Sequence, residues 1–434
     1  MSIRPETTQS SRRIAVIGSG VSGLTAAYIL ARRNDVTLYE ADARLGGHAD
    51  THRVATARGT GLAIDTGFIV HNTRTYPLLT RLFTELGVST QESEMSMSVH
   101  CNGCGLEYAG QRGLGGVLAG FRRGKLDYLR LLTEIRRFHV GARRLLRASG
   151  PDRTAEGSEQ TLGEFLAGGG YTRYFVHHFA LPFVAAVWSC SPGTALAYPA
   201  RYLFTFLDQH GLLSVSGSPP WRTVTGGSRS YVDLVAKHLT TVRTGTPVSA
   251  VRRYPGGAEV RCGRGDPART YDAVIIATHP GQALELLTDP TQAEREVLGA
   301  FRYSRNATVL HTDSRVLPTS RRARASWNYV LESCTADSDR VQVSYYMNRL
   351  QRLDTELDYI VTLNGGEVGG HGQVLDRMDY AHPVYDAQSV AAQGRLPELN
   401  DGVTAYAGAY HGWGFHEDGC RSGAAAAASL GVTW

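Results

Sequence analysis

The chain has 434 residues, more than one ordinary hydrophobic core holds, which indicates two intertwined domains. Hydrophobic residues make up 42% of it and charged residues 20%, as in globular proteins that fold without disulfides or metals. The net charge of +5 comes from arginine, because Lys125 and Lys237 are the only lysines. Apolar runs are far shorter than the roughly 20 residues of a membrane span, and no signal peptide is recognisable, so we expect a cytoplasmic protein with reduced thiols.

The first predicted elements form a strand, a glycine-rich turn, a helix and a second strand. After a polar tail over residues 1–12, which we expect to be flexible, they are Ile14–Ile17, Gly18-Ser19-Gly20-Val21-Ser22-Gly23, Leu24–Arg33 and Val36–Glu40. The first glycine permits a tight turn, the second lets backbone amides approach a pyrophosphate, and the third lets the helix pack closely on the sheet. Glu40 is placed to accept hydrogen bonds from both ribose hydroxyls. This unit predicts a bound dinucleotide.

The rest of the chain predicts a second, mixed set of elements before the first sheet resumes. Helices are expected at Arg74–Leu86, at Phe121–Arg147 with a break at Gly141, and from Phe165 to Pro182. Loops are expected over residues 101–120, 150–157 and 214–230. Strands Val341–Met347 and Tyr359–Leu363 predict a separate sheet. The remaining elements are the helices Tyr231–Leu239 and Asp418–Leu430 and the strands Pro247–Arg252, Tyr271–Ala277 and Thr404–Gly408.

Two features allow both an ordinary and a functional interpretation. Phe121–Arg147 contains eight arginines and one lysine, interleaved with leucines, which favours a solvated basic face over a helix that docks on an anionic membrane at the inner face. Nothing beyond this charge suggests nucleic-acid binding. Cys101 and Cys104 form a CxxC pair without a second pair or a nearby histidine cluster, so two incidental thiols in a turn are favoured over zinc and no metal is expected.

The segment after Glu40 narrows the prediction from a dinucleotide to FAD. Arg44 and the doublet Gly46-Gly47 resemble the signature of the flavin amine oxidase, phytoene desaturase and protoporphyrinogen oxidase superfamily, in which they lie along the FAD pyrophosphate and ribityl chain. Within this superfamily, the chain resembles a bacterial group of predicted NAD/FAD-binding flavoproteins that are often encoded near cyclopropane-fatty-acid synthases. The segments that carry this resemblance are RIAVIGSGVSGL, RLGGHADTH, DTGFIVHN, TVTGGSRSYV and GFHEDGCRSG.

Further motifs match this superfamily in the same order along almost the whole chain. They are Asp65-Thr66-Gly67-Phe68, Thr246-Pro247-Val248, Ile276-Ala277-Thr278, Tyr406-Ala407-Gly408 and Gly414–Gly419. The resemblance implies that FAD contacts Gly18, Ser19, Gly20, Val21, Ser22, Gly23, Glu40, Ala41, Arg44, Gly46, Gly47, His48, Thr66, Gly67, Phe68, Ile69, Val248, Ala277, Thr278, Gly408, Gly414, Phe415, Glu417, Asp418 and Gly419.

The resemblance also implies the architecture. We expect an α/β flavoprotein of the two-dinucleotide-binding-domain type, with a Rossmann-type FAD domain on a parallel sheet and an inserted mixed α/β substrate domain. The FAD domain is expected to combine residues 13–90, 215–285 and 395–434, and the substrate domain residues 91–214 and 286–394. Because no second strand–GxGxxG–helix unit occurs, we expect no built-in NAD(P)H domain.

Candidate catalytic residues follow from what the chain lacks. Amine-oxidising members of the superfamily usually carry a lysine on the substrate-domain sheet, and the matching stretch Tyr303–Val316 has none. His311 is its candidate acid or base, although an ordinary strand histidine fits as well. Trp413 and Phe415 in the closing loop either wall an apolar slot or simply pack.

These features predict an FAD-dependent oxidoreductase, an oxidase or desaturase that moves hydride from an apolar substrate such as a fatty-acyl or lipid chain to flavin N5. One alternative is an FAD-dependent double-bond isomerase of unsaturated fatty acids, which leaves the product mass unchanged. An amine oxidase is a second alternative, against which the missing lysine argues. A third is a non-catalytic lipid-binding protein of the same fold without FAD, against which the intact glycine motifs argue.

Overall fold

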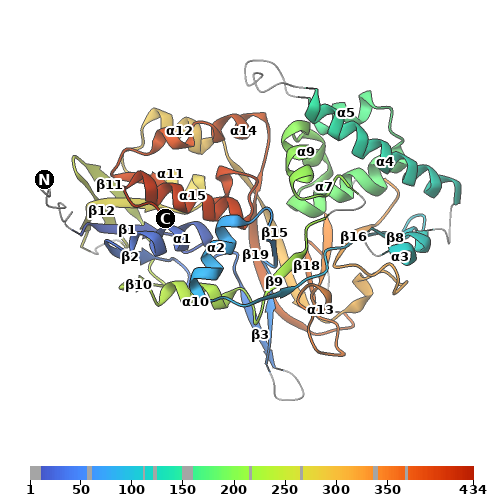
Figure 1. The fold of residues 1–434 in the computed structure, drawn as a ribbon, viewed down its shortest axis with the longest axis horizontal. Coiled ribbons are helices and arrows are strands. Elements are labelled where there is room, and N and C mark those ends of the chain that lie inside the picture. Colours follow the sequence, from blue (N-terminus) through green and yellow to red (C-terminus); the bar gives the residue numbers. More distant parts are fainter. Residues whose placement is uncertain are drawn as a thin grey trace, which may run out of the picture.

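The computed structural model describes residues 11–55, 61–110, 113–120, 125–148, 160–214, 218–263, 267–335, 341–366 and 370–434. Two layered parts lie side by side (Figure 1): a sheet with helices on both faces at the left, and a larger sheet with a group of helices at the right. The expected tail over residues 1–12, except for its last two residues, and the expected loop 150–157 lie outside the described residues.

The first part contains a five-stranded parallel sheet whose strands come from distant segments. Their order is β10-β2-β1-β14-β20, and each neighbouring pair is parallel. The strands are β1 (Arg13–Ile17), β2 (Asp35–Tyr39), β10 (Thr241–Arg243), β14 (Ala273–Ile276) and β20 (Thr404–Tyr406). Because helices cover both faces, β1, β2 and β14 read as continuous apolar runs rather than alternating ones. The predicted Rossmann-type sheet is confirmed.

Two groups of elements cover this sheet. One face packs on α1 (Val21–Leu30), α2 (Pro77–Leu86), α10 (Arg229–Ala236) and α15 (His416–Ser429). The other packs on α11 (Pro280–Leu286), α12 (Gln292–Gly299), α14 (Ala387–Gln393) and a small sheet of β11 (Ala250–Tyr254), β12 (Gly257–Arg261) and β13 (Arg269–Tyr271). Residues of α12 and α14 share this core with β14, and the expected domain bounds 13–90, 215–285 and 395–434 stay a prediction.

The second part is built on a seven-stranded mixed sheet, in the order β19-β15-β18-β17-β16-β7-β8. Only β16 and β7 run parallel among these pairs. Its strands are β7 (Met97–Cys101), β8 (Glu107–Gly110), β15 (Arg302–His311), β16 (Trp327–Leu331), β17 (Gln342–Tyr346), β18 (Ile360–Leu363) and β19 (Val374–Val384). Smaller sheets comprise β3 (Thr51–Ala55) with β4 (Gly61–Asp65), and β5 (Val70–Asn72) and β6 (Thr90–Glu92) on either side of β9 (Trp221–Val224).

A group of helices packs against the far end of this mixed sheet. It contains α3 (Gly113–Ala119), α4 (Lys125–Arg147), α5 (Leu162–Gly168), α6 (Arg173–Phe175), the π-helical η2 (Val176–Ala180), α7 (Leu181–Trp188), α8 (Pro192–Ala197) and α9 (Ala200–Gln209). The short helices α13 (Met347–Leu350), η3 (Ser314–Val316), η4 (Leu396–Leu399) and η5 (Ala409–His411) lie elsewhere. Within the described ranges no helix is both long and apolar enough to cross a membrane.

Several sequence-based boundaries need correction. The expected loops 101–120 and 214–230 contain β8, α3 and β9, because pairing with β7, β5 and β6 stabilises segments whose local sequence is rich in turn residues. Helix α4 continues through Gly141, where a Cβ would meet the Phe165 ring at 3.2 Å, so this glycine serves close packing rather than a break. The helical run does not end at Pro182, which lies directly after the π-helical η2 in the first turn of α7; the Tyr108 hydroxyl donates to the His178 carbonyl four residues before it (2.8 Å).

Candidate active site

A cavity of about 1780 Å³ extends from the glycine turn after β1 to the helices around α4. Pockets for one drug-sized ligand usually measure about 300–1,000 Å³. The cavity therefore has room for two ligands, one in contact with the parallel sheet and one against the helices. We call the second region, lined by α4, η2, α7 and the adjoining strands, the far arm.

The glycine turn forms one end of the cavity. Gly18 has φ +100° and Gly20 precedes the first residue of α1, so the N–H groups of that helix face the cavity. A Cβ on Gly20 would meet nothing within 4 Å, whereas one on Gly23 would lie 1.9 Å from the Gly18 carbonyl oxygen. Gly20 thus leaves space for an anion at the helix N-terminus, and Gly23 allows the helix to approach the strand.

Glu40 and Arg44 lie next to this turn. The Glu40 carboxylate accepts hydrogen bonds from the Ser19 amide (2.9 Å) and hydroxyl, which hold it at the end of β2. The Arg44 guanidinium donates to the Gly47 carbonyl (2.9 Å) and forms an ion pair with Asp50 (2.9 Å). A ribose beside Glu40 and a pyrophosphate between Gly20 and Arg44 fit this arrangement of charges.

Two partly buried histidines line the cavity beyond the Gly46-Gly47 doublet. The His48 ring lies 5.5 Å from the His382 ring and 5.1 Å from the Tyr380 ring, measured between centroids. Burial lowers the pKa of His48 to about 3 and that of His382 to about 4, so both are neutral at pH 7. Among the described residues the buried Nε2 of His48 has no hydrogen-bond partner, and a polar group of a bound cofactor would satisfy it.

The closing loop before α15 forms the next stretch of wall. Trp413 and Phe415 line the cavity, and the Phe415 ring stacks on Phe206 at 4.6 Å. The Trp413 indole N–H donates to the Tyr202 carbonyl (3.3 Å), and Gly414 between the two aromatics has φ +91°. The predicted apolar wall is therefore present where the cofactor region joins the far arm, and its two aromatics are also packed against α9.

Most of the residues expected to contact FAD line this cavity; five of the expected set do not, and they are Gly23, Gly46, Glu417, Asp418 and Gly419. Glu417 accepts the amide hydrogens of Leu78 and Leu79 at the start of α2 (3.1 and 3.0 Å). Asp418 accepts the Phe415 amide hydrogen (3.0 Å) and so fixes the closing loop. These two acids position the elements around the cavity, and their contact with the cofactor stays a prediction.

His311 does not line the cavity. It ends β15, at the opposite end of that strand from Tyr303, which does. Its Nε2 bonds the Thr362 hydroxyl (2.7 Å) and its Nδ1 accepts the Asp313 amide hydrogen (3.1 Å), so both ring nitrogens are engaged. Burial also lowers the pKa of His311 to about 4. The ordinary interpretation as a strand histidine fits this geometry, and a role as acid or base does not.

Sequence reasoning missed the residues that do face the cofactor region from the mixed sheet. Tyr303, the second residue of β15, stacks on His279 at 4.1 Å between centroids, and His382 of β19 is paired with the next residue, Ser304. The stretch Tyr303–Val316, which lacks the lysine of amine-oxidising members, thus begins in the strand that faces the cofactor region. No sequence signal marked His279 or His382, because single histidines before a proline occur in many loops and strands.

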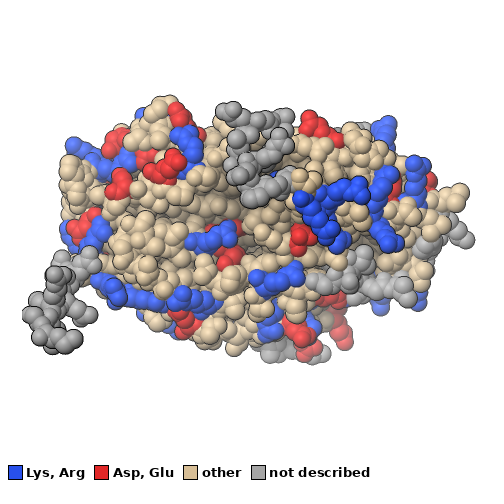
Figure 2. Space-filling model, turned by 45° about the horizontal axis from the view of Figure 1, so that its top comes forward, with Lys and Arg blue, Asp and Glu red and all other residues tan. Residues whose placement is uncertain are grey.

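The far arm has an apolar lining with two positive charges at α4. Its apolar lining includes Tyr128, Leu132, Ile135, Phe179, Phe183, Val187, Trp327 and Tyr345. Arg136 and Arg143 of α4 also line it, and basic side chains gather over the helices at the right of Figure 2. The carboxylates that line the cavity lie on β2 and its following turn, on α11 and on β19; they are Glu40, Asp42, Glu285 and Asp379. Within the described residues no carboxylate of α3 to α9 faces the far arm.

The sequence profile of one family, described as flavin containing amine oxidoreductase, matches residues 21–324, well over half of the chain. The chain belongs to this family. It is an FAD-dependent oxidoreductase, in agreement with the glycine cradle and the cavity described above. The predicted FAD-dependent oxidoreductase is thereby confirmed, and the alternative of a non-catalytic protein without FAD is set aside.

Similarity to individual proteins spans several activities. The enzyme is 27% identical over 300 residues to the carotenoid phi-ring synthase of Streptomyces griseus. The aligned region covers 65% of this chain and 55% of the synthase. Matches to L-amino-acid oxidases cover only about a tenth of their length. Among solved structures it resembles cyclohexylamine oxidase from Brevibacterium oxydans (TM-score 0.67, 16% identity, 97% and 98% covered) and a CLA-producing fatty acid isomerase from P. acnes (TM-score 0.66, 15% identity, 96% and 97% covered). At such identities these structures establish the shared fold alone.

Proposed function

We propose that the enzyme oxidises or desaturates a long apolar chain with an anionic head group, such as a fatty-acyl compound. The observation that carries this proposal is the lining of the far arm, where aromatic and aliphatic side chains predominate, His139 and Ser189 add neutral polar groups, and Arg136 and Arg143 are charged. A guanidinium binds a carboxylate or phosphate through charge-assisted hydrogen bonds. The rest of the lining matches a hydrocarbon.

Energetics favour an alkyl chain over an amine in this region. Each buried CH₂ of a chain contributes about 0.8 kcal/mol. A substrate ammonium group would be desolvated beside two arginines, at a cost of several kcal/mol without a carboxylate partner. The neutral pair His48 and His382 in the cofactor region also offers no negative charge to an ammonium group.

The side chains around the cavity orient the substrate chain and exclude water. FAD, when bound, supplies the acceptor for a substrate hydride at its N5. Trp413 and Phe415 wall the junction between the cofactor region and the far arm, so they limit how a chain can pass the ring. Phe179 and Phe183 exclude water further out, and the neutral histidines can accept or donate a hydrogen bond without adding charge.

A double-bond isomerase is the second candidate, and it uses the same cavity. It differs only in returning the hydride to another carbon of the chain, and a fatty acid isomerase of this fold is among the similar structures. The carotenoid phi-ring synthase also fits an apolar substrate class. Product mass separates the two candidates, because isomerisation leaves it unchanged.

Charge removal at the far arm tests the proposal. The double variant Arg136→Gln, Arg143→Gln should bind an unsaturated fatty acid at least about tenfold more weakly, as expected for the loss of a hydrogen bond to a charged group. The methyl ester of the same acid should bind both proteins equally. Arg144→Gln is the matched control, because Arg144 lies on the same helix and does not line the cavity. Unchanged affinity for the acid in the double variant would contradict the assignment.

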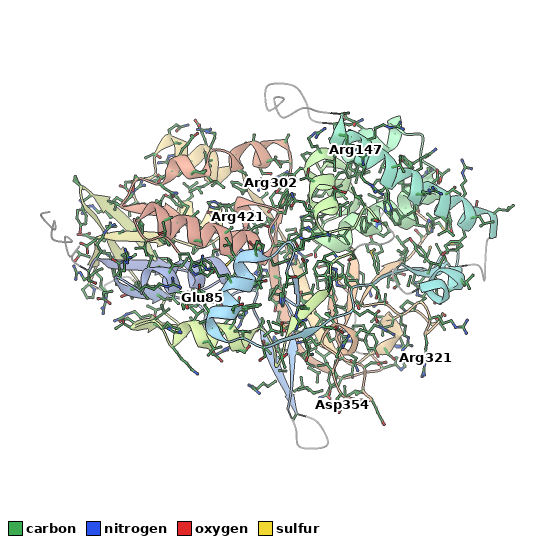
Figure 3. All side chains as sticks on the ribbon, in the orientation of Figure 1. Glu85, Arg147, Arg302, Arg321, Asp354 and Arg421 are labelled. Carbon is green, nitrogen blue, oxygen red and sulfur yellow. The ribbon has the colours of Figure 1, made fainter. Side chains whose placement is uncertain are left out.

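We further propose that α4 brings this cavity to an anionic membrane surface. Leu126, Leu129 and Val140 of this helix are 83%, 48% and 50% exposed, and Leu118 of α3 is 55% exposed. The end of the helix with Arg147 projects at the top of the helical group, away from Arg421 on α15 (Figure 3). Exposed leucines among arginines are the composition of interfacial helices.

A further inference from the structure

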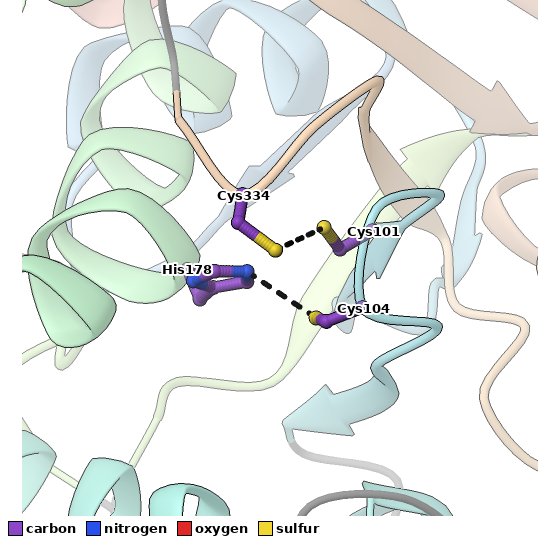
Figure 4. Close-up of side chains that lie close together, drawn as sticks. All are labelled: Cys101, Cys104, His178 and Cys334. Carbon is purple, nitrogen blue, oxygen red and sulfur yellow. Dashed lines mark hydrogen bonds between the residues drawn. The ribbon is translucent and has the colours of Figure 1, made fainter.

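Three thiols and one imidazole meet at the edge of the mixed sheet, outside the cavity (Figure 4). Cys101 ends β7, Cys104 lies in the turn before β8, Cys334 follows β16, and His178 belongs to η2. The four candidate ligand atoms all lie within 4.8 Å of one another. The Sγ atoms of Cys101 and Cys334 are 3.8 Å apart, and the Sγ of Cys104 is 3.6 Å from the Nε2 of His178.

We propose that these four side chains bind one Zn²⁺ in a closed, structural site. With Zn–S and Zn–N bonds of about 2.3 and 2.0–2.1 Å, the edges of a tetrahedral site measure about 3.8 Å between sulfurs and about 3.6 Å between sulfur and nitrogen. The Cys101–Cys334 and Cys104–His178 separations already have these lengths, and small side-chain rotations would bring the other pairs to them. Three thiolates and one imidazole fill all four positions, so no position remains for a reacting water.

The surroundings of His178 orient its ring for this role. Its Nδ1 lies 3.0 Å from the Tyr174 carbonyl oxygen, so Nδ1–H donates there and the lone pair of Nε2 faces Cys104. The Tyr108 hydroxyl donates to the His178 carbonyl (2.8 Å), and the Tyr174 ring stacks on the imidazole at 4.1 Å. Hydrogen bonds of this kind fix the tautomer and the ring direction of metal-binding histidines.

The glycines between and after the cysteines let the segments approach closely. A Cβ on Gly103 would lie 2.9 Å from the Cys334 amide nitrogen, which no side chain permits. Gly105 has φ +69°, and its amide donates to the Cys101 carbonyl (2.8 Å) to close the turn. This packing holds the CxxC turn against the Cys334 segment and against η2.

Burial makes a metal-free arrangement costly. His178 and Cys101 are both fully buried, and thiols are weak hydrogen-bond partners for an imidazole nitrogen or for each other. Zinc would replace these weak contacts with four metal–ligand bonds. It would also tie the β7–β8 hairpin and the segment after β16 to the helix that carries Phe179, a residue of the far-arm wall. The sequence-based expectation of no metal rested on Cys101 and Cys104 alone, because the other two candidate ligands, Cys334 and His178, are distant in the chain.

Elemental analysis of the purified, reduced holoenzyme tests the proposal. Prepared without chelator, it should contain about one zinc per chain, retained through dialysis. Cys104→Ser and Cys334→Ser should each lower zinc to less than about a tenth of that value. Cys262→Ser, outside the cluster, should keep it. Cys334 is exposed, so its replacement leaves the core intact, and unchanged FAD content in that variant reports a folded cofactor domain.

Cobalt provides a second readout that needs no variant. Co²⁺ exchanged into a tetrahedral thiolate site absorbs at wavelengths longer than those of oxidised flavin, and zinc should displace this signal. Wild-type protein that neither contains nor takes up zinc after reduction would overturn the proposal. Stoichiometric iron instead of zinc, or a Cys101–Cys334 disulfide in place of zinc in protein purified before any reductant is added, would overturn it as well. None of these results bears on FAD or on the substrate proposed above.

Discussion

Two glycines in the same turn have opposite reasons for lacking a side chain. Gly20 faces open space where the pyrophosphate is expected, whereas Gly23 packs against the Gly18 carbonyl. Gly20→Val should therefore yield a folded but colourless protein, because the side chain occupies the anion position. Gly23→Val should fail to fold, since its Cβ would lie 1.9 Å from backbone. Flavin absorbance and circular dichroism measure the two effects, and a yellow Gly20→Val protein would contradict the assignment of this turn.

Glu40 permits a second test at single-residue scale. Its carboxylate is held by Ser19 at the nucleotide end of the cavity, far from the aromatics of the closing loop. Glu40→Ala should weaken FAD binding by about 1–3 kcal/mol, the cost of an unsatisfied polar group at the ribose, without changing turnover of the protein that retains FAD. Glu40→Gln, which keeps one acceptor, should lie in between. Reduced turnover at full FAD occupancy would place Glu40 near the chemistry and refute this role.

At the scale of elements, α4 carries the membrane proposal. Arg137 stacks on Tyr171, and Arg143 donates to the Leu213 carbonyl. Arg136 and Arg144 are exposed near Val140. The charges of Arg136 and Arg144 can therefore be reversed without loss of packing. Arg136→Glu with Arg144→Glu should weaken binding to anionic vesicles by about 1 kcal/mol per lost charge, and added salt should weaken wild-type binding. Vesicle sedimentation measures both.

A control for this experiment is Arg229→Glu on α10, which reverses one charge, where the α4 variant reverses two, at a residue paired with Asp233 (2.7 Å). It should leave vesicle binding nearly unchanged. If wild type and the α4 variant bind anionic vesicles equally at low salt, the membrane proposal is contradicted, and α4 is a helix with a solvated basic face.

Elements with a clear local apolar or glycine pattern were predicted well, including β14, β17, β18 and β20, and the elements without such a pattern were missed. Strands β1 and β2 and the turn between them were located within a few residues, because strand, glycines and acid lie in one short segment. Strand β9 was expected to be a loop, because its stability comes from β5 and β6, which lie far away in the chain. Likewise the cofactor side of the cavity followed from motifs, whereas the far arm depends on which faces of α4 and α7 the tertiary packing buries.

At the scale of the whole molecule, buried neutral histidines predict acid sensitivity. Burial lowers the pKa to about 3 in His48 and to about 4 in several others, namely His71, His139, His210, His311, His382 and His411. Unfolded histidine has a pKa of about 6.5, so between pH 4 and 6.5 the unfolded chain binds more protons. Stability is therefore highest above this window and falls as the pH falls through it. His52, whose pKa is raised by its hydrogen bond with Asp50, acts in the opposite direction.

Each such histidine should remove about 1 kcal/mol of stability between pH 7.5 and 5.5. Urea unfolding at the two pH values should thus show a loss of several kcal/mol, and His311→Gln, which removes one titrating group, should make the loss smaller by about 1 kcal/mol. Stability that is independent of pH in this range would mean that these histidines are not neutral in the folded protein.

The central claim is that an FAD-dependent oxidoreductase of an amine oxidase family acts on an apolar, anionic chain rather than on an amine. Anaerobic mixing of the yellow protein with two ligands of equal chain length, a long-chain unsaturated fatty acid and the corresponding alkylamine, tests it most directly. Flavin absorbance is followed together with the mass and double-bond position of the recovered ligand. The account predicts that the acid either bleaches the flavin or returns with a moved double bond, while the amine does neither. Rapid bleaching by the amine, with the acid recovered unchanged, would contradict it.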